Sequence, residues 1–151
     1  DSIGDNIYFR LQRLCPVFNE LLVKNSPKNK YWQTVFERPQ SHLKNSDCLE
    51  FQEYKNYKYI EMNGDTVKLK IDSGFWVDNF KDGTYSKLKV YWSLDCYFDI
   101  EFIESNNNIR KKFSKPGDKF RYTILEKFDN YYLMSVEIVG IKRFSIFKIF
   151  Y

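Results

Sequence analysis

The feature that most constrains the fold is a two-residue alternation of apolar and polar residues that begins after Cys48 and continues to the C-terminus. In residues 67–71 and 87–92, every second side chain is apolar and most of those between are lysines. This alternation is typical of β-strands with one buried face. Turn residues separate the runs, and the connections are too short for parallel crossovers. We therefore expect an antiparallel meander.

The meander has about eight or nine predicted strands. Closure, or near closure, into a barrel would hide the unpaired edges and bury one continuous aromatic face. A lipocalin-like barrel of about eight strands is either filled by side chains or holds one small ligand. The strands are expected at residues 50–61, 66–71, 75–80, 84–93, 95–104, 109–114, 119–127, 131–139 and 143–150.

Composition supports an all-β class. Aromatic residues make up 19% of the 151 residues, and alanine is absent. The best helix former is missing while residues that suit strands abound, which excludes a helical bundle. No apolar run approaches the about 18 residues that a membrane-spanning helix needs. The abundance of Lys, Asn, Ile, Phe and Tyr is typical of an AT-rich coding sequence.

The first 47 residues differ from the rest and are expected to form an extension packed on a barrel domain of residues 48–151, the two making one structural unit. Apolar residues from Ile7 to Leu22 recur every three or four positions, which predicts an amphipathic helix within residues 6–24. Pro16 either kinks this helix or starts a second one. Residues 25–29 and 39–47 read as loops, and 31–36 as a helical turn or short strand. The helix would plug one end of the barrel or lie on its flank.

Charge and motif content argue against nucleic-acid binding and catalysis. The net charge is only +4, and the densest basic cluster, Arg110–Lys112, falls in a predicted solvated hairpin. No phosphate-cradling glycine motif occurs. The single histidine, His42, and three separated cysteines do not make a metal-ligand set. We therefore expect no enzyme activity, catalytic residue, metal or cofactor.

From Cys48 onward, a series of short features resembles one group of proteins. They are Cys48 with Phe51, the aromatic run at 54–59, Trp-Ser-Leu-Asp-Cys-Tyr at 92–97, Lys-Pro-Gly-Asp at 115–118 and Tyr-Tyr at 131–132. Together they resemble small uncharacterised bacterial β-rich proteins, some of which carry the automatic label of a DNA topoisomerase IV subunit. The resemblance implies a compact meander with Cys48 and Cys96 as its recurring cysteines, no established activity, and often a secreted or envelope location. It does not extend to residues 1–47, and residues 77–80 depart from its pattern.

The cysteines leave two interpretations open. In an envelope or secreted protein whose leader has been removed, a Cys48–Cys96 disulfide would add about 4 kcal/mol in the chain-entropy model. In a cytoplasmic protein, Cys96 would be a small reduced core residue. The third thiol, Cys15, would be awkward in an oxidising compartment, and it favours the reduced interpretation.

The aromatic residues give two sets of candidate site residues. One set would line a cavity for a small apolar ligand, or else fill the core: Trp76, Trp92, Phe98, Phe102 and Tyr122. The other set would form an exposed partner surface: Tyr85, Tyr91, Tyr97, Tyr131, Phe147, Phe150 and Tyr151. The tail 143–151 would close the sheet or join a neighbour's edge.

These observations predict a non-enzymatic binding module that recognises a protein partner within a bacterial assembly or envelope system. One alternative is a lipocalin-like carrier of a small apolar ligand. Another is an immunity-type protein that blocks a toxin.

Overall fold

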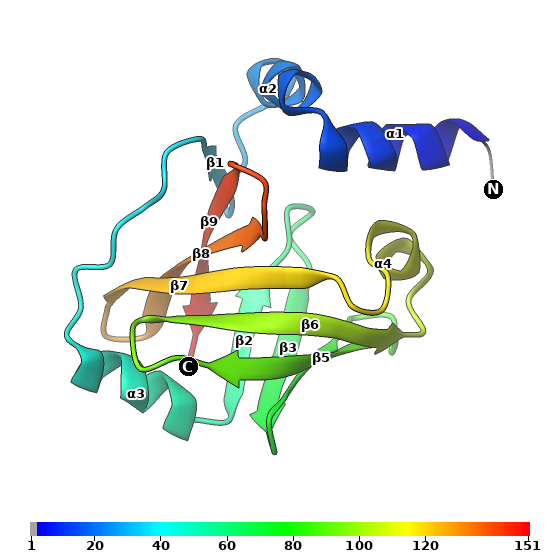
Figure 1. The fold of residues 1–151 in the computed structure, drawn as a ribbon. Coiled ribbons are helices and arrows are strands. Elements are labelled where there is room, and N and C mark those ends of the chain that lie inside the picture. The colour runs from blue at the N-terminus through cyan, green and yellow to red at the C-terminus, as the bar shows by residue number, and fades with distance from the viewer. Residues whose placement is uncertain (1–2) are drawn as a thin grey trace.

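In the computed structural model, which describes residues 3–151, eight antiparallel strands form a closed barrel (Figure 1). The expected all-β barrel is thus confirmed. None of the helices within residues 3–151 is both long and apolar enough to cross a membrane. The barrel strands are β2 (Asn56–Ile60), β3 (Thr66–Asp72), β4 (Phe75–Asn79), β5 (Tyr85–Trp92), β6 (Tyr97–Ser105), β7 (Lys119–Lys127), β8 (Tyr131–Ile138) and β9 (Phe144–Phe150).

The last strand, β9, closes the barrel by pairing with both β8 and β2. It pairs with β8 along its whole length, but it meets β2 only where Phe150 lies opposite Lys58. Over its first half, β9 instead pairs with the extra strand β1 (Gln33–Val35). The tail therefore acts as a closing strand, and the segment 31–36 supplies a short strand.

Two of the predicted strands are wrong, one wholly and one at its start, because helices occupy these residues. Residues 109–114 lie largely in helix α4 (Asn108–Phe113), because the Asn107 side chain caps it by accepting hydrogen bonds from the backbone N–H groups of Ile109 and Arg110. Helix α3 (Asn45–Glu53) takes up the end of the predicted loop and the start of the predicted first strand.

The helical structure predicted for residues 6–24 is confirmed, but the apolar stripe of these residues is not fully buried against the barrel. Helix α1 (Ile3–Leu14) is followed by α2 (Pro16–Asn25), with Pro16 in the first turn, where its missing N–H costs nothing. Ile7 and Leu14 are 53% and 65% exposed. The helices lie above the barrel in Figure 1. The α1 part of the stripe is exposed, whereas Phe18 and Leu22 of α2 are half-buried.

Helix α3 plugs the opposite end of the barrel, a role the sequence had suggested for the N-terminal helix (Figure 1). Its Phe51 is fully buried and packs against the rings of Tyr57, Phe98 and Tyr132, with centroids 4.6, 5.7 and 5.2 Å away. The same helix is bonded covalently to the barrel wall by a Cys48–Cys96 disulfide. The reduced interpretation of Cys96 is therefore wrong in this structure, because α3 brings the two Cα atoms within 5.3 Å, inside the range a disulfide needs. Cys15 stays free.

Candidate functional site

The end of the barrel opposite α3 contains a cavity of about 970 Å³. Its wall is mainly apolar, formed by inward-facing side chains of β5 to β9 such as Leu88, Ile100, Phe102, Phe120 and Val136. The volume is near the upper end of the usual range for small-molecule sites. The barrel is thus packed in one half and hollow in the other.

Trp32 seals the seam where β2 and β9 separate. Its ring stacks on Phe147 with centroids 4.2 Å apart and meets Tyr59 edge-on at 6.3 Å. Its indole N–H donates to the Ile60 carbonyl oxygen at 2.7 Å. A residue outside the barrel strands therefore completes the cavity wall.

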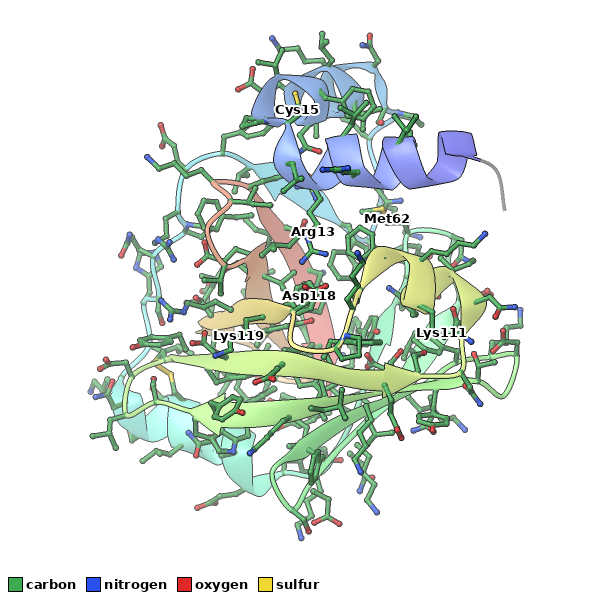
Figure 2. The ribbon with its side chains drawn as sticks, turned by 45° about the vertical axis from the view of Figure 1, so that its right-hand side comes forward. Arg13, Cys15, Met62, Lys111, Asp118 and Lys119 are labelled. Atoms are coloured by element: carbon green, nitrogen blue, oxygen red, sulfur yellow. A yellow bond between two sulfur atoms is a disulfide. The ribbon has the colours of Figure 1, made fainter. Side chains whose placement is uncertain are left out.

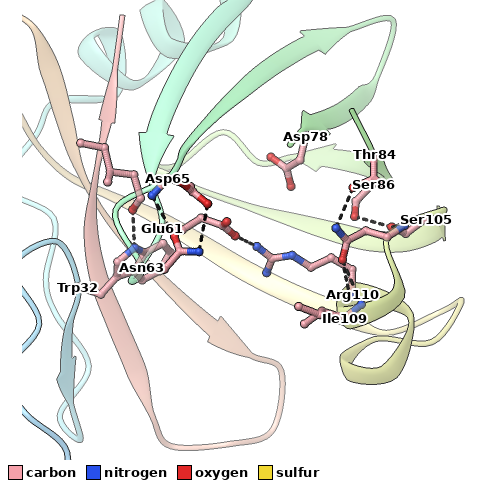
Figure 3. Close-up of polar contacts among 12 residues, drawn as sticks. Trp32, Glu61, Asn63, Asp65, Asp78, Thr84, Ser86, Ser105, Ile109 and Arg110 are labelled. Carbon is pink, nitrogen blue, oxygen red and sulfur yellow. Dashed lines mark hydrogen bonds and ion pairs between the residues drawn. The ribbon is translucent and has the colours of Figure 1, made fainter. Parts of the chain in front are cut away.

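One side of the cavity is polar (Figure 3). Arg110 reaches from α4 to form an ion pair with Glu61, at the end of β2. Tyr59 lines the same part of the cavity, where the charge of Arg110 acts on it and where it lies near Asp78. Asp78 in turn accepts a 3.0 Å hydrogen bond from the Trp76 indole N–H. The network links the mouth of the cavity to a carboxylate that is 8% exposed.

Burial perturbs the titration of this network. Removal from water raises the pKa of Asp78 to about 7, although the hydrogen bonds from Trp76 and Tyr59 oppose the shift. Burial also raises the pKa of Tyr59 and Tyr122 well above the usual tyrosine range, and the nearby charge of Asp78 adds to both shifts. Asp78, Tyr59 and Tyr122 all line the cavity, and the Trp76 indole that donates to Asp78 packs against Tyr122 with ring centroids 4.9 Å apart.

The raised pKa of Asp78 predicts that stability falls as the pH rises from about 4 to about 7. In that window the unfolded carboxyl is ionised while the folded one holds its proton, so ionisation destabilises the folded state. Asp78→Asn should remove a slope of about 1 kcal/mol per pH unit, measured by urea unfolding across the window. Asp82→Asn is the matched control, because the hydrogen bond from the Thr84 side chain lowers the pKa of Asp82 and places its titration below the window. Equal slopes in wild type and Asp78→Asn would contradict the prediction.

Helices α1 and α2 are tied to the rim of the cavity by two polar contacts. Arg13 of α1 forms an ion pair with Asp118, just before β7, with Nη2 and Oδ1 2.6 Å apart; Figure 2 shows Arg13 pointing down toward it. Arg143, just before β9, donates to the Asn19 side chain of α2 at 2.5 Å. Gln12 of α1 also lines the cavity, as Arg143 does, so α1 covers part of its mouth.

The five predicted cavity residues divide between the two halves of the barrel. Phe102 and Tyr122 line the cavity. Trp76 and Phe98 are fully buried in the packed half, and Trp92 packs against Phe51 and Phe98 near α3. Alternation identifies the inward face of a strand but not the height of a residue along the barrel.

The predicted partner surface needs one correction, because Phe147 points inward and stacks on Trp32. The other six are half-buried or exposed, and several are engaged by neighbours. Tyr85 and Tyr91 donate to Glu104 and Glu101. The others are Tyr97, which lies under the Arg121 guanidinium, and Tyr131, Phe150 and Tyr151, which pack with other aromatic rings.

Sequence reasoning missed four residues of the site: Trp32, Tyr59, Asp78 and Arg110. Of these four, Asp78 could have been recognised from the sequence, because it occupies an inward position in the alternation of β4, between Trp76 and Phe80. A carboxylate at such a position is rare without a special role. No family model, curated protein or solved structure matches the chain, so the resemblance to small bacterial β-rich proteins stays a prediction.

Proposed function

We propose that the barrel is a carrier that binds one small, largely apolar molecule in its open half. The observation that supports this proposal is the asymmetry of the interior. Buried side chains, many of them aromatic, pack the half next to α3, whereas the other half keeps about 970 Å³ open behind an apolar wall. Leaving apolar surface unpacked costs stability, which a bound ligand would recover.

Binding of a neutral fluorescent apolar dye, N-phenylnaphthylamine, tests the proposal. We expect saturable binding of one dye per chain, with enhanced emission. Leu88→Trp places a bulky ring in the cavity and should weaken binding by about tenfold or more. Lys89→Trp is the matched control, because its side chain lies on the exposed face of the same strand.

The stability of both tryptophan variants is measured by urea unfolding, so that a fall in binding can be separated from unfolding. The proposal fails if the wild type does not bind the dye, or if folded Leu88→Trp binds it as tightly as the wild type does.

A second function, binding of a protein partner, is favoured by exposed apolar side chains where α1 and α2 meet and along α2. Leu14, Val17 and Leu21 are 65%, 67% and 53% exposed. Exposed apolar residues that cluster are typical of interaction sites. Co-purification of wild type and of a Leu14→Lys, Val17→Lys double variant tests this function, which predicts a partner that only the wild type retains.

A further inference from the structure

Asp78 is a buried carboxylate in the cavity wall without a cationic partner. No ion pair within residues 3–151 includes it, and it accepts a 3.0 Å hydrogen bond from the neutral indole N–H of Trp76. The other buried or half-buried carboxylates of the cavity are paired: Glu61 with Arg110, Asp65 with Lys81, and Glu137 with Arg38. A buried charge without a partner is costly, so this position favours a ligand that brings the opposite charge.

The aromatic rings around Asp78 also suit a cation. Tyr59 of β2 and Tyr122 of β7 line the cavity together with Asp78, and Trp76, whose indole N–H donates to the carboxylate, packs behind Tyr122 with ring centroids 4.9 Å apart. The faces of Trp and Tyr rings attract ammonium groups, by about 2 kcal/mol or more when the site is dry. A carboxylate among such rings offers an ammonium group both charge neutralisation and favourable ring contacts.

The groups that surround Asp78 do not neutralise its negative charge, so a cationic ligand can. From β2 and β7 come the neutral phenols Tyr59 and Tyr122, and its partner across β5 is Ser86. From α4 comes Arg110, whose charge is already balanced by Glu61 (Figure 3). An anionic ligand would instead meet an uncompensated carboxylate.

Building on the proposed function, we propose that the molecule carried is an amine on an aromatic or apolar body, with its ammonium group bound by Asp78 and its body against the apolar wall. Arg143 at the rim favours the same orientation, because it is hydrogen-bonded to the neutral Asn19 side chain, has no ion pair among residues 3–151, and repels an ammonium group left at the mouth.

Isothermal titration calorimetry with three indoles of similar size tests this assignment: tryptamine, which is cationic, tryptophol, which is neutral, and indoleacetate, which is anionic. At about pH 8, where Asp78 is ionised, we expect tryptamine to bind about tenfold or more tightly than tryptophol, and indoleacetate to bind most weakly. Lowering the pH to about 5 protonates Asp78 and should remove the preference for tryptamine.

Asp78→Asn keeps the shape of the side chain and should weaken tryptamine binding by about tenfold while changing tryptophol binding little. Asp82→Asn removes an exposed carboxylate from the rim and should leave the preference intact. Dye binding by Asp78→Asn reports whether its barrel is folded. If that variant binds no dye, Tyr122→Leu, which removes one ring beside the carboxylate, takes its place and should lower the preference for tryptamine.

The outcomes separate the two proposals. Dye binding with equal affinity for tryptamine and tryptophol overturns the amine assignment and leaves the carrier function standing. Absence of dye binding by the wild type overturns the carrier function itself. A preference for indoleacetate, or a preference for tryptamine that persists in folded Asp78→Asn, also overturns the assignment.

Discussion

Phe51→Ala is expected to lower the free energy of unfolding by about 3–5 kcal/mol, the usual cost of deleting a large ring from a closed core. Phe51 is fully buried, and its ring joins α3 to β2, β6 and β8 through Tyr57, Phe98 and Tyr132. Its removal leaves a void at the plugged end of the barrel. Urea unfolding followed by near-ultraviolet circular dichroism measures the loss.

Leu49→Ala is the matched control on the same helix, because Leu49 is 47% exposed and its truncation should cost less than about 1 kcal/mol. Equal costs at the two positions would show that α3 does not plug the barrel as described. The open cavity lies at the other end, so folded Phe51→Ala should still bind the dye.

Removing the disulfide with Cys48→Ala and Cys96→Ala should destabilise the protein by about 4 kcal/mol, through the greater freedom of the unfolded chain. The bond joins residues 48 positions apart, so it closes a long loop. Urea unfolding of the oxidised wild type and the double variant measures the difference.

A reducing agent provides the internal comparison. It should destabilise the wild type and leave the double variant unchanged, since Cys15 has no disulfide partner. Cys15→Ser should match the wild type under both conditions. A wild type whose stability does not respond to complete reduction would contradict the prediction.

Local alternation was enough to predict most of the barrel. Residues such as Val67, Leu69 and Ile71 predict strand and inward face together, because successive side chains in a strand point to opposite sides. The same reasoning failed at residues 109–114, where the Asn107 cap formed a helix from a segment with no clear alternation. The exposed position expected for Phe147 is wrong because this residue lies on the inward face of β9, where its ring stacks on Trp32.

The candidate site could be predicted only in part. Phe102 and Tyr122 follow from the inward face of their strands. The positions of Trp32 against Phe147, and of Arg110 beside Glu61, depend on contacts between segments far apart in the chain. No local pattern carries that information.

The sequence by itself determined that the chain is an antiparallel β protein with an N-terminal amphipathic helical region interrupted at Pro16, because alternation, helical periodicity and turn residues act over a few neighbouring positions. Only the tertiary structure decided which end of the barrel is filled and which is hollow. That outcome depends on three long-range contacts: the docking of α3, the pairing of β9 with β1 at one end and with β2 at the other, and the disulfide between Cys48 and Cys96. Such contacts join segments that are far apart in the chain, so no local pattern predicts them or the cavity that Asp78 lines.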